Sequence, residues 1–92
     1  MADLPNYAQA RALYERILAL SKEVFDESHP YVAPLINNLG GVLKAHGDLE
    51  GAKAGYERAL NIFREFLGDN HPNTKTVKRN LELHIRSMKE RL

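Results

Sequence analysis

The chain has 92 residues, of which 43% are hydrophobic and 27% charged, with a formal net charge of +1, which excludes a disordered chain and predicts one small folded domain. The absence of cysteine excludes disulfides, thiolate nucleophiles and cysteine-ligated zinc, and it is compatible with a reducing compartment. Because the sequence has neither a basic leader pattern nor a long apolar run, we expect a cytoplasmic chain with no signal peptide and no membrane span.

The first predicted helix covers residues 6–25. Its start is indicated by Asn6 followed by Gln9, which is the spacing of a capping box. A break at residues 26–30 separates it from a second helix over residues 31–46. Pro34 lies inside that helix, where it removes an amide donor and crowds the preceding turn. We therefore expect the second helix to start late or to kink.

The second half of the chain contains two more predicted helices. Gly47 is a left-handed C-terminal cap and Asp48 an N-terminal cap, which together start a third helix over residues 49–67. A second break precedes a fourth helix over residues 72–91, which carries one apolar stripe formed by Val77, Leu81, Ile85, Met88 and Leu92. Because short links make neighbouring helices antiparallel, the expected fold is an all-α helix-turn-helix solenoid of four helices in a single domain, residues 1–92.

The sequence repeats itself with a period of 42 residues. Eleven of the fifty residue pairs at this shift are identical, among them Tyr14 with Tyr56 and Asn38 with Asn80. The histidine–proline pairs that precede the second and fourth helices also coincide at this shift. A fixed period of this size indicates repeats that bury their apolar faces by stacking on their neighbours.

One stretch of the sequence carries a family pattern: Leu39-Gly40-x-x-Leu43-x-x-x-Gly47-Asp48-x-x-x-Ala52-x-x-x-Tyr56-x-x-Ala59. This stretch resembles the tetratricopeptide repeat, in which small residues at these offsets let two helices approach and a tyrosine fills the wedge beside them. The usual period is about 34 residues. The longer period, the histidine–proline starts and the Asn-Asn-Leu sequence are similar to the kinesin-light-chain type of this repeat.

The resemblance implies one complete repeat at residues 31–67, preceded by a lone second helix and followed by a lone first helix of a repeat. It also implies a non-catalytic module that binds a protein or peptide in a concave groove. Two residues depart from the pattern, because Glu82 and Lys89 replace its two glycines. Ile17 replaces the small Ala59 of the next repeat, which we expect to widen the contact of the first helix.

The groove positions of the family fall on the second and fourth helices. On this sequence they are Pro34, Asn37, Asn38, Gly41, Lys44, Ala45, Thr76, Arg79, Asn80, Leu83, Arg86 and Ser87. We select Asn37, Asn38, Gly41, Lys44, Arg79, Asn80, Leu83 and Arg86 as candidate peptide-binding residues. Asparagine amides can bind the main chain of an extended ligand, and arginine pairs with carboxylates in a bidentate manner.

The charge distribution favours an acidic partner at the C-terminal end. Residues 1–71 hold seven basic and ten acidic side chains, whereas residues 72–92 hold six basic and two acidic ones. Each candidate also has a structural explanation. Asn38 and Asn80 would equally well join neighbouring helices, Arg79 and Arg86 would solvate a terminal helix, and Leu83 would be an ordinary exposed leucine.

An alternative function comes from the first helix, which is apolar around a wide arc although few residues precede it in this sequence. This pattern suits a self-associating repeat element, or an engineered or excised scaffold, that forms a homo-oligomer through Leu13, Tyr14 and Ile17. The oligomeric state distinguishes this alternative from peptide binding.

Other chemistry finds little support in the sequence. The four histidines have no ligand spacing and are interpreted as capping or solvated residues, so no metal is expected. Neither the serines nor the glycines form a nucleophile elbow or a phosphate loop. No aromatic residue alternates with the basic ones, which argues against nucleic acid. We therefore predict no catalytic residue, no cofactor and no enzymatic activity.

Overall fold

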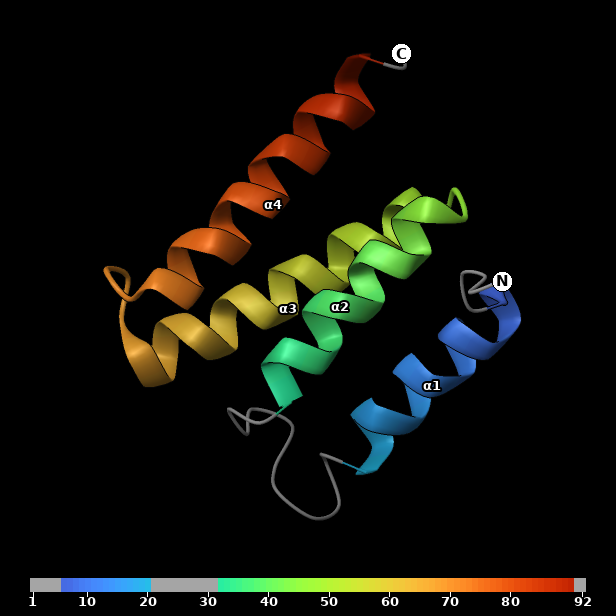
Figure 1. The fold of residues 1–92 in the computed structure, drawn as a ribbon, viewed down its shortest axis with the longest axis horizontal. Helices are drawn as coiled ribbons and strands as arrows, with labels where there is room; N and C mark the ends of the chain where they lie inside the picture. The colour runs from blue at the N-terminus through green and yellow to red at the C-terminus, as the bar shows by residue number, and fades with distance from the viewer. Residues whose placement is uncertain (1–5, 21–31, 91–92) are drawn as a thin grey trace, which may run out of the picture.

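The computed structural model describes residues 6–20 and 32–90 and contains four α-helices within them (Figure 1): α1 (Tyr7–Leu20), α2 (Val32–Ala45), α3 (Leu49–Leu67) and α4 (Pro72–Glu90). The described residues include no strand, and the predicted all-α fold is confirmed. The helices stack in chain order, α2 packing against α1 and α3, and α3 against α4. The expected ends of the first helix at residues 21–25 and of the fourth at residue 91 lie outside the described residues.

The helix caps agree with the sequence. The side-chain oxygen of Asn6 accepts a hydrogen bond of 2.8 Å from the amide of Ala8 at the start of α1. Asp48 does the same for the amide of Gly51 at 2.9 Å, at the start of α3. Gly47, with a φ of 87°, ends α2 in the left-handed conformation that only glycine adopts without strain. Gly47 and Asp48 therefore form the short link between α2 and α3, one ending the first helix and the other starting the second.

Pro34 does not interrupt α2. The helix runs from Val32 to Ala45, so Pro34 is its third residue. Amides in the first turn of a helix have no intrahelical partner, and a proline there removes nothing that the helix needs. The α-helix is therefore continuous from Val32 to Ala45, and its expected first residue, at position 31, lies outside the described residues.

Small residues allow α2 and α3 to pack closely. A Cβ atom at Gly40 would lie 3.1 Å from Cε1 of Tyr56, and one at Gly55 would lie 3.4 Å from the carbonyl oxygen of Ile36. Ala52 and Ala59 are fully buried. The two helices thus meet at a distance that larger side chains would prevent, and the ring of Tyr56 fills the remaining space.

His84 occupies a position that the sequence did not suggest. It is fully buried, and its Nε2 lies 2.8 Å from the carbonyl oxygen of Leu49, while its ring meets the ring of Tyr56 edge to face at 5.6 Å. The interpretation of this histidine as a capping or solvated residue was wrong. Together with Thr74 and Val77 it forms the buried face of α4, whereas Ile85 and Met88 of the expected stripe stay partly exposed.

Candidate functional site

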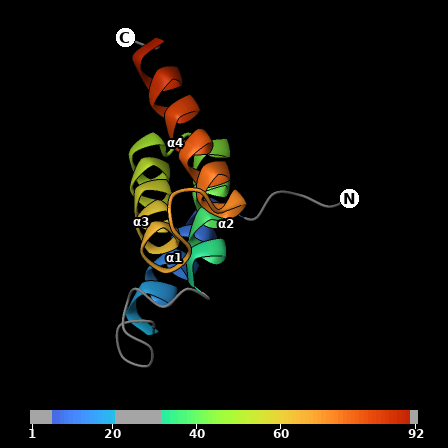
Figure 2. The ribbon, with the colours of Figure 1, turned by 90° about the vertical axis from the view of Figure 1, so that its left-hand side faces the viewer.

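A hollow of about 190 Å³ lies between the N-terminal halves of α2 and α4. In the turned view, α2 and the first turns of α4 lie on one side of the molecule and α3 on the other (Figure 2). The hollow is lined by three asparagines, one threonine and three apolar residues: Asn37, Asn38, Asn73, Thr76, Pro34, Phe63 and Val77. None of the described residues that line it carries a charged side chain.

The asparagines of this hollow differ in what they contact. Nδ2 of Asn80 donates to Oδ1 of Asn37 at 3.5 Å, a long hydrogen bond that joins α4 to α2. Asn38 and Asn73 are exposed at the rim. Asn80 therefore joins two helices, as one of the two explanations of this residue predicted, and its partner is Asn37. Asn38, in contrast, lines the hollow.

The basic candidates lie apart from the hollow. Arg79 and Arg86 are exposed on α4, and they follow the buried Val77 and His84 by two residues, which is about 200° around the helix. They thus point away from α3. Arg86 borders a separate hollow with Glu82, Ile85 and Lys89. The structure thus divides the candidate set into an amide-lined part and a basic part.

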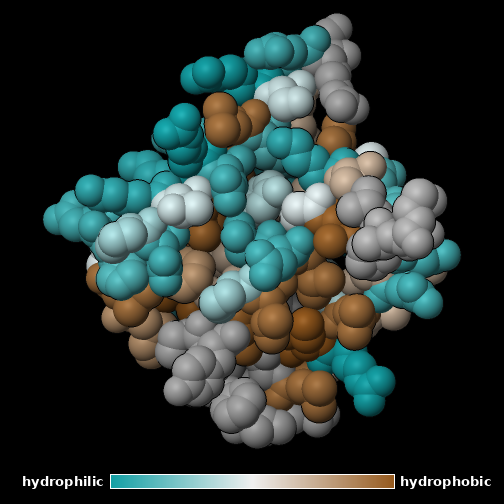
Figure 3. Space-filling view, in the orientation of Figure 1, coloured by the Kyte–Doolittle hydropathy of each residue, from teal (hydrophilic) through white to brown (hydrophobic). Residues whose placement is uncertain are grey.

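The remaining candidates lie on the same two helices. Lys44 is exposed in the last turn of α2, Gly41 is half-buried, and Leu83 is 46% exposed. No described carboxylate forms an ion pair with Lys44, Arg79 or Arg86. Figure 3 shows the result on the surface, where hydrophilic residues predominate over α4 and hydrophobic residues gather toward α1 and the start of α2.

The stacked helices and their small-residue contacts have a counterpart among known families. The family model described as "Tetratricopeptide repeat" matches residues 2–65 and again residues 32–84. The chain belongs to the tetratricopeptide repeat family. Tetratricopeptide repeats are in general non-catalytic modules that bind proteins or peptides. No curated protein matches the chain.

The α1 helix of this tetratricopeptide repeat chain is only partly exposed. Leu13 is 50% exposed and borders a hollow with Gln9, Ala12 and Arg16. Tyr14, in contrast, is only 7% exposed, and Ile17 packs against the same core cluster. Of the three residues selected for self-association, only Leu13 therefore offers its side chain to a second molecule.

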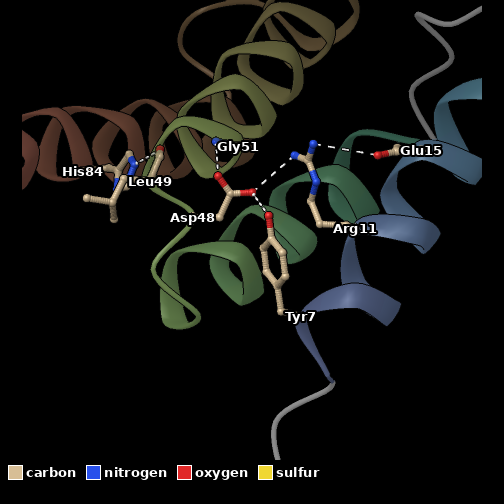
Figure 4. Close-up of polar contacts among 7 residues, drawn as sticks. All are labelled: Tyr7, Arg11, Glu15, Asp48, Leu49, Gly51 and His84. Atoms are coloured by element: carbon tan, nitrogen blue, oxygen red, sulfur yellow. Dashed lines mark hydrogen bonds and ion pairs between the residues drawn. The ribbon is translucent and has the colours of Figure 1, made fainter.

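A polar cluster that the sequence did not predict holds α1 to the rest of the repeat (Figure 4). Oδ2 of Asp48 accepts hydrogen bonds from the Tyr7 hydroxyl at 2.9 Å and from Nη1 of Arg11 at 3.3 Å, while Oδ1 caps α3. The hydrogen bond to Asp48 raises the pKa of the Tyr7 phenol above its ordinary value. A Cβ atom at Gly51 would collide with Oδ2 of Asp48, so a larger residue there would displace this carboxylate.

Three residues of the amide-lined hollow were missing from the candidate positions: Phe63, Asn73 and Val77. Phe63 belongs to α3 and Val77 to the buried stripe of α4, and the family pattern places neither in the groove. The described residues also hold no group of three His, Cys, Asp or Glu side chains that could bind a metal ion. None of the described helices is long and apolar enough to cross a membrane.

Proposed function

We propose that this tetratricopeptide repeat chain binds an acidic peptide segment on the face formed by α2 and α4. The observation that carries the proposal is the set of exposed cations, Lys44, Arg79 and Arg86, that have no ion-pair partner among the described residues and lie on the two helices that line the amide-rich hollow. We further propose a cytoplasmic location, which suits a chain without cysteine.

The residue types of this face suit an extended ligand. Each asparagine side chain carries both an amide donor and a carbonyl acceptor, so it can bind a peptide main chain without reading its sequence. Each arginine presents a planar fork of donors that matches a carboxylate. Because the face is shallow and is formed by two of the described helices, we expect affinities of about micromolar or weaker.

The first experiment reverses the charge of the two arginines. In Arg79→Glu/Arg86→Glu, we expect binding of a fluorescein-labelled library of acidic peptides to be abolished, because the surface then repels carboxylates. Fluorescence anisotropy measures the binding, and circular dichroism should show unchanged helicity. Arg16→Glu/Arg58→Glu is the matched control, since it alters the net charge equally but on α1 and α3. Failure of the wild-type chain to bind any acidic peptide contradicts the proposal.

A second candidate function is self-association through the exposed face of α1. The observation that favours it is that Leu13 and Leu20 are 50% and 49% exposed on the same helix. Light scattering across a concentration series should then reveal a dimer that Leu13→Lys dissociates. Phe66→Lys, at an equally exposed position of α3, is the control and should leave the dimer intact. A monomer at every concentration argues against this function.

A further inference from the structure

The amide-lined hollow and two of the basic candidates lie toward opposite ends of the face formed by α2 and α4. Helices α2 and α4 run in the same direction, because each is antiparallel to α3 (Figure 1). The amide-lined hollow lies near their N-terminal ends, with Asn38 and Thr76 on its wall. Lys44 and Arg86 lie near their C-terminal ends. The described residues that line the hollow are therefore uncharged, whereas Lys44 and Arg86 make the other end of the face basic, with Arg79 between the two.

We propose that the uncharged end receives one uncharged side chain of the peptide ligand, while the ligand's carboxylates bind at the basic end. This inference rests on the proposed function and adds a requirement for the ligand. The hollow of about 190 Å³ has room for a single side chain, since a dry cavity of about 150 Å³ already holds a benzene molecule.

The lining of the hollow determines the chemistry of that side chain. Phe63 and Val77 provide an apolar floor, and Asn38, Asn73 and Thr76 provide donors and acceptors at the rim. An ammonium group entering the hollow would lose water without meeting a carboxylate among the described lining residues, which is costly. A small amide or hydroxyl side chain would instead bury its carbons on the floor and hydrogen-bond at the rim.

The helix geometry sets the distance between this side chain and the carboxylates. Thr76 and Arg86 are ten residues apart on α4, which corresponds to about 15 Å along the helix axis. An extended peptide rises about 3.3 Å per residue, so the carboxylates should follow or precede the uncharged side chain by about four to five residues.

The experiment compares three ten-residue peptides in a glycine–serine background. The first has asparagine at the third position, glutamates at the seventh and eighth, and lysine at the tenth. The second exchanges the asparagine and the lysine, which leaves composition and net charge unchanged. The third replaces both glutamates of the first peptide with glutamine. Titrations into the ¹⁵N-labelled chain, followed through the side-chain amide signals of its asparagines, give the three affinities.

We expect the first peptide to bind about tenfold more tightly than the second, because only the second places an ammonium group in the uncharged hollow. Asn38→Asp supplies the missing negative charge and should remove or reverse this preference. Asn61→Asp, which adds the same charge at an exposed position of α3, should retain it.

The results separate the inference from the function on which it rests. If the first two peptides bind equally well and the third binds more weakly, the inference is overturned and the acidic-peptide function stands. If the glutamates make no difference to binding, the acidic-peptide function is overturned together with the inference. A preference for the first peptide that Asn38→Asp leaves unchanged also overturns the inference, because the hollow is then not the site of recognition.

Discussion

The junction of α1 with α2 and the junction of α3 with α4 are built from equivalent positions of the 42-residue repeat, yet they pack differently. Their tyrosines are equally buried, with Tyr14 7% and Tyr56 6% exposed. Farther along the helices the exposure of equivalent residues differs. Leu20, on the same face of α1 as Leu13, is 49% exposed, whereas its counterpart Ile62 is 4% exposed because α2 covers the equivalent face of α3.

The helix on the other side of each junction shows the same difference. Leu35 of α2 is 50% exposed, whereas its counterpart in α4, Val77, is 2% exposed. Ile17 stands in the first junction where the fully buried Ala59 stands in the second. We predict that this exchange widens the first junction, because a branched side chain holds the facing helix farther away than a methyl group. The repeat pattern thus places a buried tyrosine in the wedge of both junctions, whereas the residues beside it differ.

Removal of the tyrosine rings should give the largest difference in unfolding free energy between the two junctions. Tyr56→Ala should lower the free energy of unfolding by about 3 to 5 kcal/mol, because it leaves a cavity beside Gly40 and His84 in the middle of the stack. Tyr14→Ala should cost about 2 kcal/mol, since α1 can detach while α2, α3 and α4 remain packed. Urea denaturation followed by circular dichroism measures both values.

The phenylalanine variants at the two positions are the controls. They keep the ring in place, so each should lose far less than the corresponding alanine variant. Equal losses in Tyr14→Ala and Tyr56→Ala would show that the chain unfolds as one unit. The α1–α2 and α3–α4 junctions would then contribute equally to the free energy of unfolding.

Much of the fold could be predicted from the sequence because its determinants are local. Gly47 and Asp48 act on the adjacent backbone, and the 42-residue period repeats the same helix contacts. The burial of His84 could not be predicted in this way. Its partners, Leu49 and Tyr56, are 35 and 28 residues away in the sequence, and nothing in the spacing of the histidines indicates either contact.

The candidate site was predictable only in part, for a similar reason. A family position identifies the helix face on which Asn38 or Arg86 lies, but not which of those side chains share a hollow. The separation of Asn38 from Arg86 depends on how α2 and α4 pack against α3. Phe63 was missed because it belongs to α3, a helix that the groove pattern does not include.

The two N-terminal caps, Asn6 and Asp48, also occupy equivalent repeat positions. Their removal should lower the free energy of unfolding by smaller amounts. Asp48→Ala should cost about 1 to 2 kcal/mol, because the carboxylate caps α3 and also accepts hydrogen bonds from Tyr7 and Arg11. Asn6→Ala should cost only about 0.5 to 1 kcal/mol, since its single bond caps the end helix. Urea denaturation compares them, and equal losses would mean that the bonds to α1 add no stability.

The ionisation of Tyr7 provides an independent measurement of the same contact. Because the pKa of Tyr7 in the folded chain lies above its ordinary value of 10.0, the bond to Asp48 stabilises the fold below that value and is lost as the pH rises through the higher folded value. In Asp48→Ala the pKa of Tyr7 should fall back toward 10.0, as followed by NMR of ¹³C-labelled tyrosine. Tyr56, whose pKa is raised by burial alone, should not change. An unchanged pKa of Tyr7 would show that Asp48 acts on α3 only, and that α1 is held by its apolar face.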